Sequence, residues 1–316
     1  MELNAQLLRI ECRTTASLAL PEFTGSALRG AILGTLRGLF CPERGRADCA
    51  PCPFTGVCPI SRLIATVDET ASRGEEAPRP YVLRPVVAAA RMLDSGDPFS
   101  FGLTLIGSAE MAFPYLLQGL QAMGEAGFGL RQRAAGTFEV ERVLAQNPFI
   151  AAEQTVYERG RATVYAPGLP VSQAQISAYA SLLSASSLRV ELRSPLRLVV
   201  NGSLARRLTM AVLTRRLLRR LTDLCRHFGG GPLEANFESL LAIAERVEVV
   251  EDDTKWLDLE SFSGRSKRRT PIGGLVGGVN FSGELAPLLP YLAWLPVIGL
   301  GKDVTKGNGW IELVTR

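Results

Sequence analysis

The order of strand and helix patterns repeats once along this chain of 316 residues, and this repetition constrains the fold more than any other feature. Apolar periodicity separates the two kinds of element, because strands alternate every two residues and helices repeat every 3.6. The first half predicts strands at 7–13, 80–87, 99–107 and 136–144, and helices at 25–40 and 109–127. The second half predicts strands at 188–200, 244–251, 273–283 and 309–314, and helices at 205–228 and 284–295.

Each half therefore has the order strand, helix, strand, strand, helix, strand, which describes a ferredoxin-like unit of the split β-α-β-β-α-β kind. We expect an α+β protein with two such units in tandem. The first domain should span residues 1–145, with a cysteine-rich insertion at 41–58, and the second should span 186–316. Residues 146–185 contain Pro148, Pro167 and Pro170, which predicts a connector between the domains.

Composition narrows the class of protein. Hydrophobic residues make up 47% of the chain and charged residues 21%, which is typical of a globular protein. No apolar run reaches the roughly 18 residues of a membrane span, and the opening MELNAQLLRIECR has no continuous apolar core of the kind that a secretory signal needs. We therefore expect a cytoplasmic protein with no membrane partner.

The net charge of +4 is modest, but the positive residues are clustered. Seven arginines and one acidic residue, Asp223, lie between Arg206 and Arg226. On a helix, apolar residues such as Leu217 and Leu221 share one face and most of these arginines the other. A second cluster covers residues 265–269. These clusters predict either a track for a polyanion or a solvated helix face. The candidate contacts are Arg215, Arg216, Arg219, Arg220, Arg265, Lys267, Arg268 and Arg269.

The segment VIGLGKDVTKGNGW, residues 297–310, sets two lysines among four glycines. Glycine allows a close backbone approach, successive amides can point at an anion, and a lysine adds a mobile charge. Lys302 and Lys306 are therefore candidate phosphate contacts, although an ordinary glycine-rich turn with solvated lysines has the same pattern.

Four of the six cysteines, Cys41, Cys49, Cys52 and Cys58, fall within 18 residues with the spacing C-x7-C-x2-C-x5-C. In a cytoplasmic protein this density favours metal binding over disulfides. Four thiolates without a histidine suit a structural Zn²⁺ or a [4Fe–4S] cluster, and the spacing does not separate the two. Cys12 and Cys225 lie on apolar faces and are expected in the core.

Several stretches together resemble one family. Residues 96–143, which begin GDPFSFGLTLIGSAEMAFPYLL, are similar to the first domain of the CRISPR-associated endoribonucleases that process precursor CRISPR RNA, members of the RAMP superfamily. Residues 272–313 resemble that family's closing segment and its glycine-rich loop. SALRGAILGTLRGLFC with the following cysteines is similar to a subgroup that carries a cysteine cluster. The resemblance implies two ferredoxin-like domains, binding of CRISPR repeat RNA on a basic surface, and cleavage without metal that leaves a 2′,3′-cyclic phosphate.

The chain departs from this family at the first helix, where many relatives carry a catalytic histidine and this sequence has none. Its one histidine, His227, lies at the end of the arginine-rich helix and could act as a base or acid, or only cap that helix. Arg29 and Arg37 on the first helix are the other candidate catalytic residues. Two rival functions remain open: an inactive subunit that binds CRISPR RNA or assembles effector subunits, and a metal-cluster protein that senses redox state.

Overall fold

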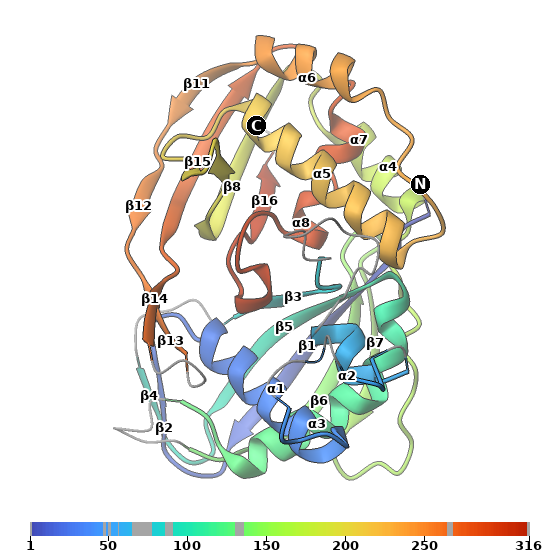
Figure 1. Cartoon of the computed structure of the whole chain (residues 1–316), viewed down its shortest axis with the longest axis vertical. Helices are drawn as coiled ribbons and strands as arrows, with labels where there is room; N and C mark the ends of the chain where they lie inside the picture. Colours follow the sequence, from blue (N-terminus) through green and yellow to red (C-terminus); the bar gives the residue numbers. More distant parts are fainter. Residues whose placement is uncertain are drawn as a thin grey trace. The chain divides into compact units, whose positions relative to one another are not determined.

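The computed structural model describes residues 2–46, 49, 52–55, 57–64, 78–85, 91–129, 136–263 and 268–314. The chain forms two compact units, and their helices and strands are labelled along the ribbon in Figure 1. The first unit comprises Gln6–Pro170, and the second comprises Met1–Ala5 together with Val171–Arg316. The order of elements within each unit follows the predicted repeat.

The first unit is built on a five-stranded sheet in the order β3-β5-β1-β6-β7. β1 pairs antiparallel with β6, β3 with β5, and β6 with β7. The strands are β1 (Ala5–Thr14), β3 (Tyr81–Arg84), β5 (Pro98–Ile106), β6 (Phe138–Asn147) and β7 (Ala152–Glu158). A separate pair joins β2 (Leu18–Leu20) to β4 (Arg91–Leu93). Strands distant in sequence are therefore neighbours, as a split unit requires.

Helices α1 (Gly25–Phe40) and α3 (Phe113–Ala126) pack against each other and against this sheet, while the short α2 (Pro59–Ile64) follows the cysteines. A 3₁₀ turn, η1 (Gly107–Ala112), leads into α3. The two helices approach closely at Gly119, where the Thr35 hydroxyl donates to the Gly119 carbonyl at 2.9 Å. A Cβ at that glycine would lie 2.7 Å from Leu36, so the contact requires a residue without a side chain.

The second unit has a sheet in the order β11-β15-β8-β16, with β12 also paired to β15. Its strands are β8 (Ser187–Leu196), β11 (Glu248–Asp252), β12 (Lys255–Leu257), β15 (Gly274–Ser282) and β16 (Ile311–Val314). Two small hairpins accompany it, β9 (Val199–Val200) with β10 (Ser203–Leu204), and β13 (Glu260–Ser263) with β14 (Arg268–Pro271). The strands β11-β15-β8-β16 have the same order as β3-β5-β1-β6 in the first unit. In both sheets the first of these four strands along the chain lies between the third and the fourth.

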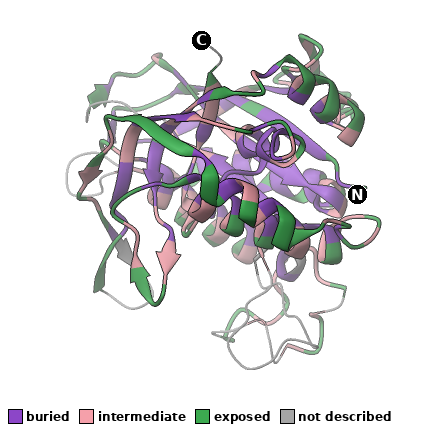
Figure 2. Cartoon of the chain, turned by 90° about the horizontal axis from the view of Figure 1, so that it is seen from above, coloured by how far each residue is buried: buried purple, intermediate pink, exposed green. Residues whose placement is uncertain are grey.

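The longest helix of the second unit is α5 (Met210–Phe228), which begins where the Thr209 hydroxyl accepts a hydrogen bond from the Val212 amide at 3.3 Å. Its inner face is fully buried and includes Leu213, Leu217, Leu221 and Leu224. Other helices are α4 (Gln173–Leu182), α6 (Phe237–Arg246), α7 (Leu289–Leu292) and α8 (Leu295–Ile298), and η2 (Val304–Lys306) is a 3₁₀ turn. Buried residues line the sheet and the inner helix faces, and exposed residues lie on the outer helix faces (Figure 2).

The structure differs from the sequence expectation in three segments. The expected connector 146–185 contains β7, which extends the first sheet, and α4, which belongs to the second unit, so the units divide at Pro170. The strand expected at 244–251 begins only at Glu248, as β11, because residues 237–246 form α6. The expected helix 284–295 is two short helices, because Pro290 and Pro296 lack the amide that a continuous helix needs and each stands at a helix start.

In the part of the chain that the structure describes, every helix is too short or too polar to span a lipid bilayer.

Candidate functional site

The outer face of α5 carries arginines, as the sequence predicts. Arg215 and Arg219 are exposed, and the side chain of Arg215 is 61% accessible. The sequence shows almost no acidic residue among these arginines, but Glu245 on α6 lies 3.9 Å from Arg215. At that distance and exposure the pair is weak, so the positive charge of Arg215 remains available to an anion.

Arg216 and Arg220, also predicted to contact a polyanion, are used inside the second unit. Arg216 donates a hydrogen bond to the Val199 carbonyl. Arg220 donates from Nη2 to the Ile298 carbonyl at 2.8 Å and from Nε to the Gly299 carbonyl at 3.0 Å. Burial lowers the pKa of Arg220 to about 10, and the nearby Asp223 raises it. Both guanidinium groups therefore hold backbone in place, and Arg220 ties α5 to the start of the glycine-rich loop.

The glycine-rich loop 297–310 is folded on itself. Gly301 and Gly309 have φ values of 91° and 68°, and a Cβ on Gly309 would lie 1.8 Å from the Leu300 carbonyl oxygen. Many of its amides already donate to carbonyls within the second unit, namely those of Leu300, Lys302, Lys306, Gly307, Asn308 and Gly309. The prediction that these glycines bring amides to a phosphate is not supported, because they are needed for the loop's own turns.

The two loop lysines have different surroundings. Lys302 is exposed. Lys306 is half-buried, and its Nζ lies 2.8 Å from Asp303 Oδ1, while Arg197 Nη1 lies 2.9 Å from Asp303 Oδ2. Asp303 therefore sits between two cations and offsets part of their charge. Of the two predicted phosphate contacts, Lys302 has the more available charge.

The second basic cluster lies only partly within the described residues. Arg268 and Arg269 are on β14 and are exposed, and Arg269 pairs with Glu260 at 3.1 Å. Arg265 and Lys267 lie outside the described residues. Arg206, which belongs to the first basic cluster but was not among its candidate contacts, has its guanidinium carbon 3.6 Å from the centre of the Trp256 ring.

His227 lies in the last turn of α5, one residue before the helix ends. It is half-buried, and its ring centre is 6.1 Å from that of Phe228, at an interplanar angle of 49°. The helix ends at Gly229, whose amide donates to the Cys225 carbonyl at 3.1 Å. This position suits the capping role that the sequence allowed, since a cation near a helix C-terminus meets the negative end of the helix dipole.

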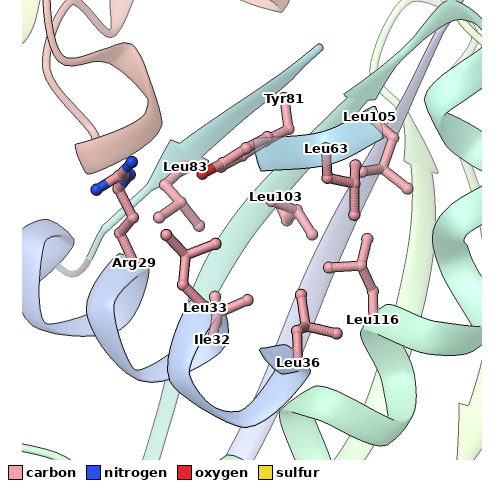
Figure 3. A pocket seen from close by; sticks show the side chains of 10 residues that line it. All are labelled: Arg29, Ile32, Leu33, Leu36, Leu63, Tyr81, Leu83, Leu103, Leu105 and Leu116. Atoms are coloured by element: carbon pink, nitrogen blue, oxygen red, sulfur yellow. The ribbon is translucent and has the colours of Figure 1, made fainter. Parts of the chain in front are cut away.

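Arg29 lies at a pocket in the first unit, shown in Figure 3. The pocket is narrow and is lined almost entirely by apolar side chains from α1, α2, α3 and the sheet. Its lining residues are Ile32, Leu33, Leu36, Leu63, Tyr81, Leu83, Leu103, Leu105 and Leu116, together with Arg29. The Tyr81 ring crosses this space, and its hydroxyl is directed to the side on which Arg29 lies.

Two buried polar atoms of this pocket are unsatisfied. Among the described residues, neither Arg29 Nε nor the Tyr81 hydroxyl has a hydrogen-bond partner. A buried polar group without a partner costs about 1–3 kcal/mol, so both atoms favour a bound acceptor. The sequence did not identify Tyr81 as a candidate site residue, because an aromatic residue is common in a strand.

Arg37, the other candidate on α1, is engaged elsewhere. Its Nη2 donates to the Arg46 carbonyl in the cysteine-rich insertion. Arg29 and Arg37 are eight residues apart, or about 12 Å along a helix. Of the two, only Arg29 lines the pocket.

The cysteine-rich insertion folds back through a tight turn, in which the Cys52 amide donates to the Cys49 carbonyl at 3.0 Å. None of the four cysteines is in a disulfide. Burial raises the pKa of the Cys49 thiol; Arg37 lowers it, while the thiols of Cys41, Cys58 and Cys52 raise it. Cys41, Cys52 and Cys58 are thus within electrostatic range of Cys49. However, no three His, Cys, Asp or Glu side chains of the described residues form a group that could hold a metal ion.

The other two cysteines are buried in the cores of the two units, as predicted. Burial raises the pKa of the Cys225 thiol to about 11, and it also raises that of Cys12. Both are therefore neutral, unreactive packing groups at neutral pH.

Known protein families match both parts of the chain. Residues 3–169 match the AF_1859_N family, described as an N-terminal domain. Residues 190–311 match the family of the CRISPR-associated endoribonuclease Cas6. No curated protein matches the sequence.

Solved structures share the fold over nearly the whole chain. A product complex of the Thermus thermophilus Cas6 protein TTHB231 is 14% identical, with a TM-score of 0.57, and the match covers 98% of this chain and 100% of that one. A substrate mimic complex of the Cas6 protein TTHA0078 is 17% identical, with a TM-score of 0.52 and coverage of 98% and 99%.

A chain of a partial Cas6-RT-Cas1–Cas2 complex is 14% identical, with a TM-score of 0.58, and the match covers 100% of this chain and 46% of that longer one. At these identities the structural likeness establishes the fold. The chain belongs to the AF_1859_N family, whose model matches residues 3–169, and its residues 190–311 are similar to the CRISPR-associated endoribonuclease family Cas6.

Proposed function

We propose that this protein binds the repeat RNA of CRISPR transcripts and cuts precursor CRISPR RNA. The observation that carries this proposal is the match of residues 190–311 to a family of CRISPR-associated endoribonucleases. The fold supports it, because one similar structure is a product complex and another is a substrate mimic complex. We also infer that each unit is a ferredoxin-like domain, since both sheets have the strand order of a split β-α-β-β-α-β unit.

The RNA-binding surface of the second unit is proposed to include the exposed cations of the predicted clusters. Arg215 and Arg219 on α5, Lys302 in the loop, and Arg268 on β14 all reach solvent. Their charges can neutralise phosphates and release counterions, so affinity should fall steeply as salt rises. Arg216 and Arg220 are proposed to act indirectly, by holding the backbone that presents this surface.

Cleavage is proposed to proceed without a metal ion. A base removes the proton of the 2′-hydroxyl, the 2′-oxygen bonds to phosphorus, and the bond to the 5′-oxygen breaks as that oxygen gains a proton. The products are a 2′,3′-cyclic phosphate and a 5′-hydroxyl. The protein must position the phosphate and stabilise the negative charge that develops on it.

Arg29 is the favoured residue for that stabilisation. Its Nε lacks a partner among the described residues, so the guanidinium is proposed to donate to a phosphate oxygen. His227 is the alternative base or acid, and its place in the last turn of α5 favours a capping role.

The four cysteines are proposed to hold a structural Zn²⁺, with a [4Fe–4S] cluster as the alternative. The chemistry of the donor set supports this proposal, because the insertion carries four thiols that form no disulfide. A metal there would stabilise the insertion that follows α1, as closed four-ligand sites do. Cys41, Cys49, Cys52 and Cys58 would be its ligands, and the chain would then belong to the family's cysteine-bearing subgroup.

The proposal is tested with end-labelled repeat RNA, incubated with the protein in excess EDTA. We expect a single cut within the repeat, and no cut in an RNA of the same composition with a scrambled sequence. Tight repeat binding without cleavage would instead indicate an inactive subunit that binds CRISPR RNA or contacts other effector proteins, a role that the missing histidine of α1 favours. Absence of both binding and cleavage would overturn the proposal.

A further inference from the structure

An arginine and a tryptophan are stacked on the surface of the second unit. Arg206 lies just after β10, and its guanidinium carbon is 3.6 Å from the centre of the Trp256 ring on β12. The indole Nε1 donates to Asp258 Oδ1 at 2.9 Å, which fixes the orientation of the ring. Arg206 is exposed and Trp256 is half-buried, so the stack is reached from solvent.

The Arg206 guanidinium forms no ion pair with a residue that the structure describes. In the described part of the chain, Arg206 has no carboxylate partner, and neither have its exposed neighbours Arg207 and Lys255. Other arginines of the same unit do pair: Arg189 with Glu191 at 2.8 Å, Arg193 with Glu312 at 2.7 Å, and Arg246 with Glu284 at 3.5 Å. The stack therefore combines a flat cation, an aromatic ring and two further free cations.

This combination suits one kind of ligand. Unpaired RNA bases are recognised by stacking on aromatic rings and on guanidinium planes, while nearby cations contact the phosphates. A base in a duplex is already stacked on its neighbours and cannot do this without unpairing. A carboxylate ligand could bind the arginine and lysine side chains alone and would not use the aromatic ring of Trp256.

We propose that Arg206 and Trp256 form a stacking platform for one unpaired base of the bound RNA, with Arg207 and Lys255 on the flanking phosphates. This inference rests on the proposed RNA binding and adds to it a single-stranded segment and the residues that receive it. The platform belongs to β12, which pairs with β15 along the same edge of the sheet as β11.

The test compares two variants by their dependence on salt. Trp256→Ala should weaken binding of single-stranded repeat RNA about fivefold to 150-fold, because it removes stacking, and should leave the slope of log K against log salt unchanged. Arg206→Ala should weaken binding and also reduce the magnitude of that slope by about 0.7, because one charge is lost. Trp256→Phe keeps an aromatic ring and should retain most of the affinity.

Indole fluorescence gives a second readout in case Trp256→Ala fails to fold. RNA should quench the emission of the wild type, and the quenching should be reduced in Trp256→Phe. Trp294→Phe, which removes a fully buried indole, is the matched control and should keep the full quenching. Unchanged affinity in Trp256→Ala, or equal quenching in Trp256→Phe, would overturn the platform while leaving the proposed function intact. A wild-type protein that binds no repeat RNA would overturn the proposed function itself.

Discussion

The Arg220 guanidinium donates a hydrogen bond to the carbonyl oxygen of Gly299, 3.0 Å away, and so connects the middle of α5 to the first glycine of the loop. A second bond runs from Arg220 to the Ile298 carbonyl at 2.8 Å. The arginine that looked like part of an RNA-binding row is therefore a support for the loop. Replacement of Arg220 should therefore affect the stability of the protein more than replacement of an exposed arginine of α5.

Replacement of Arg220 by methionine should lower the free energy of unfolding by about 2–4 kcal/mol, because two desolvated carbonyls lose their donors. Arg215→Met, on the exposed face of the same helix, is the matched control and should change stability by less than about 0.5 kcal/mol. Urea denaturation of both variants measures the difference. Equal effects would mean that Arg220 does not anchor the loop.

Lys302 and Lys306 should contribute unequally to RNA binding. Lys302→Met should reduce the magnitude of the salt slope by about 0.7, since an exposed cation is lost. Lys306→Met should change it less, because the Lys306 ammonium is already 2.8 Å from the carboxylate of Asp303. Titration of RNA at several salt concentrations measures both slopes. A larger loss for Lys306→Met would contradict the pairing as described.

The sequence predicted the repeat of elements well, because strong apolar periodicity defines the central strands and helices. The bounds of α1 were predicted as residues 25–40 and are the same in the structure. The buried face of α5 was also predicted correctly. Segments with weaker patterns were missed: α6 and α4 are short, and β7 alternates between half-buried and exposed residues at the sheet edge.

The roles of individual site residues were harder to predict, because they depend on tertiary contacts. Arg220 was predicted to contact RNA, although it stands three residues after Leu217 and four before Leu224, both fully buried. That spacing is the signal that could have placed it inward. Nothing in the sequence pairs Arg206 with Trp256, since they are 50 residues apart and meet only when β12 joins the sheet.

The cysteine proposal predicts loss of metal on mutation. Cys49→Ser with Cys52→Ser should abolish bound metal and lower the stability of the insertion, since binding energy at such a site is folding energy. Cys225→Ala, which removes a buried thiol of the other unit, is the control and should keep the full metal content. Elemental analysis identifies zinc, and absorption near ~400 nm would identify an iron–sulfur cluster. Stoichiometric metal in the double variant would eliminate the proposed ligands.

The two candidate catalytic sites differ in their expected kinetics. Arg29→Ala should slow single-turnover cleavage about 10²–10³-fold, as loss of a transition-state donor does, with little change in RNA affinity. Arg37→Ala should have a smaller effect, because Arg37 is bonded to the Arg46 carbonyl. His227→Ala should leave the rate near that of the wild type and cost about 1 kcal/mol of stability or less. A fall of about 10²–10⁴-fold in His227→Ala would make His227 the general base or acid instead.

The most direct test of the central claim is cleavage of a repeat RNA that carries one 2′-deoxy nucleotide at the cut site, measured in EDTA beside the unmodified RNA. The account predicts that the unmodified RNA is cut to a 2′,3′-cyclic phosphate and a 5′-hydroxyl, and that the substituted RNA is bound equally well but not cut, because the attacking hydroxyl is absent. Cleavage of the substituted RNA at the same position, or cleavage that EDTA abolishes, would contradict it.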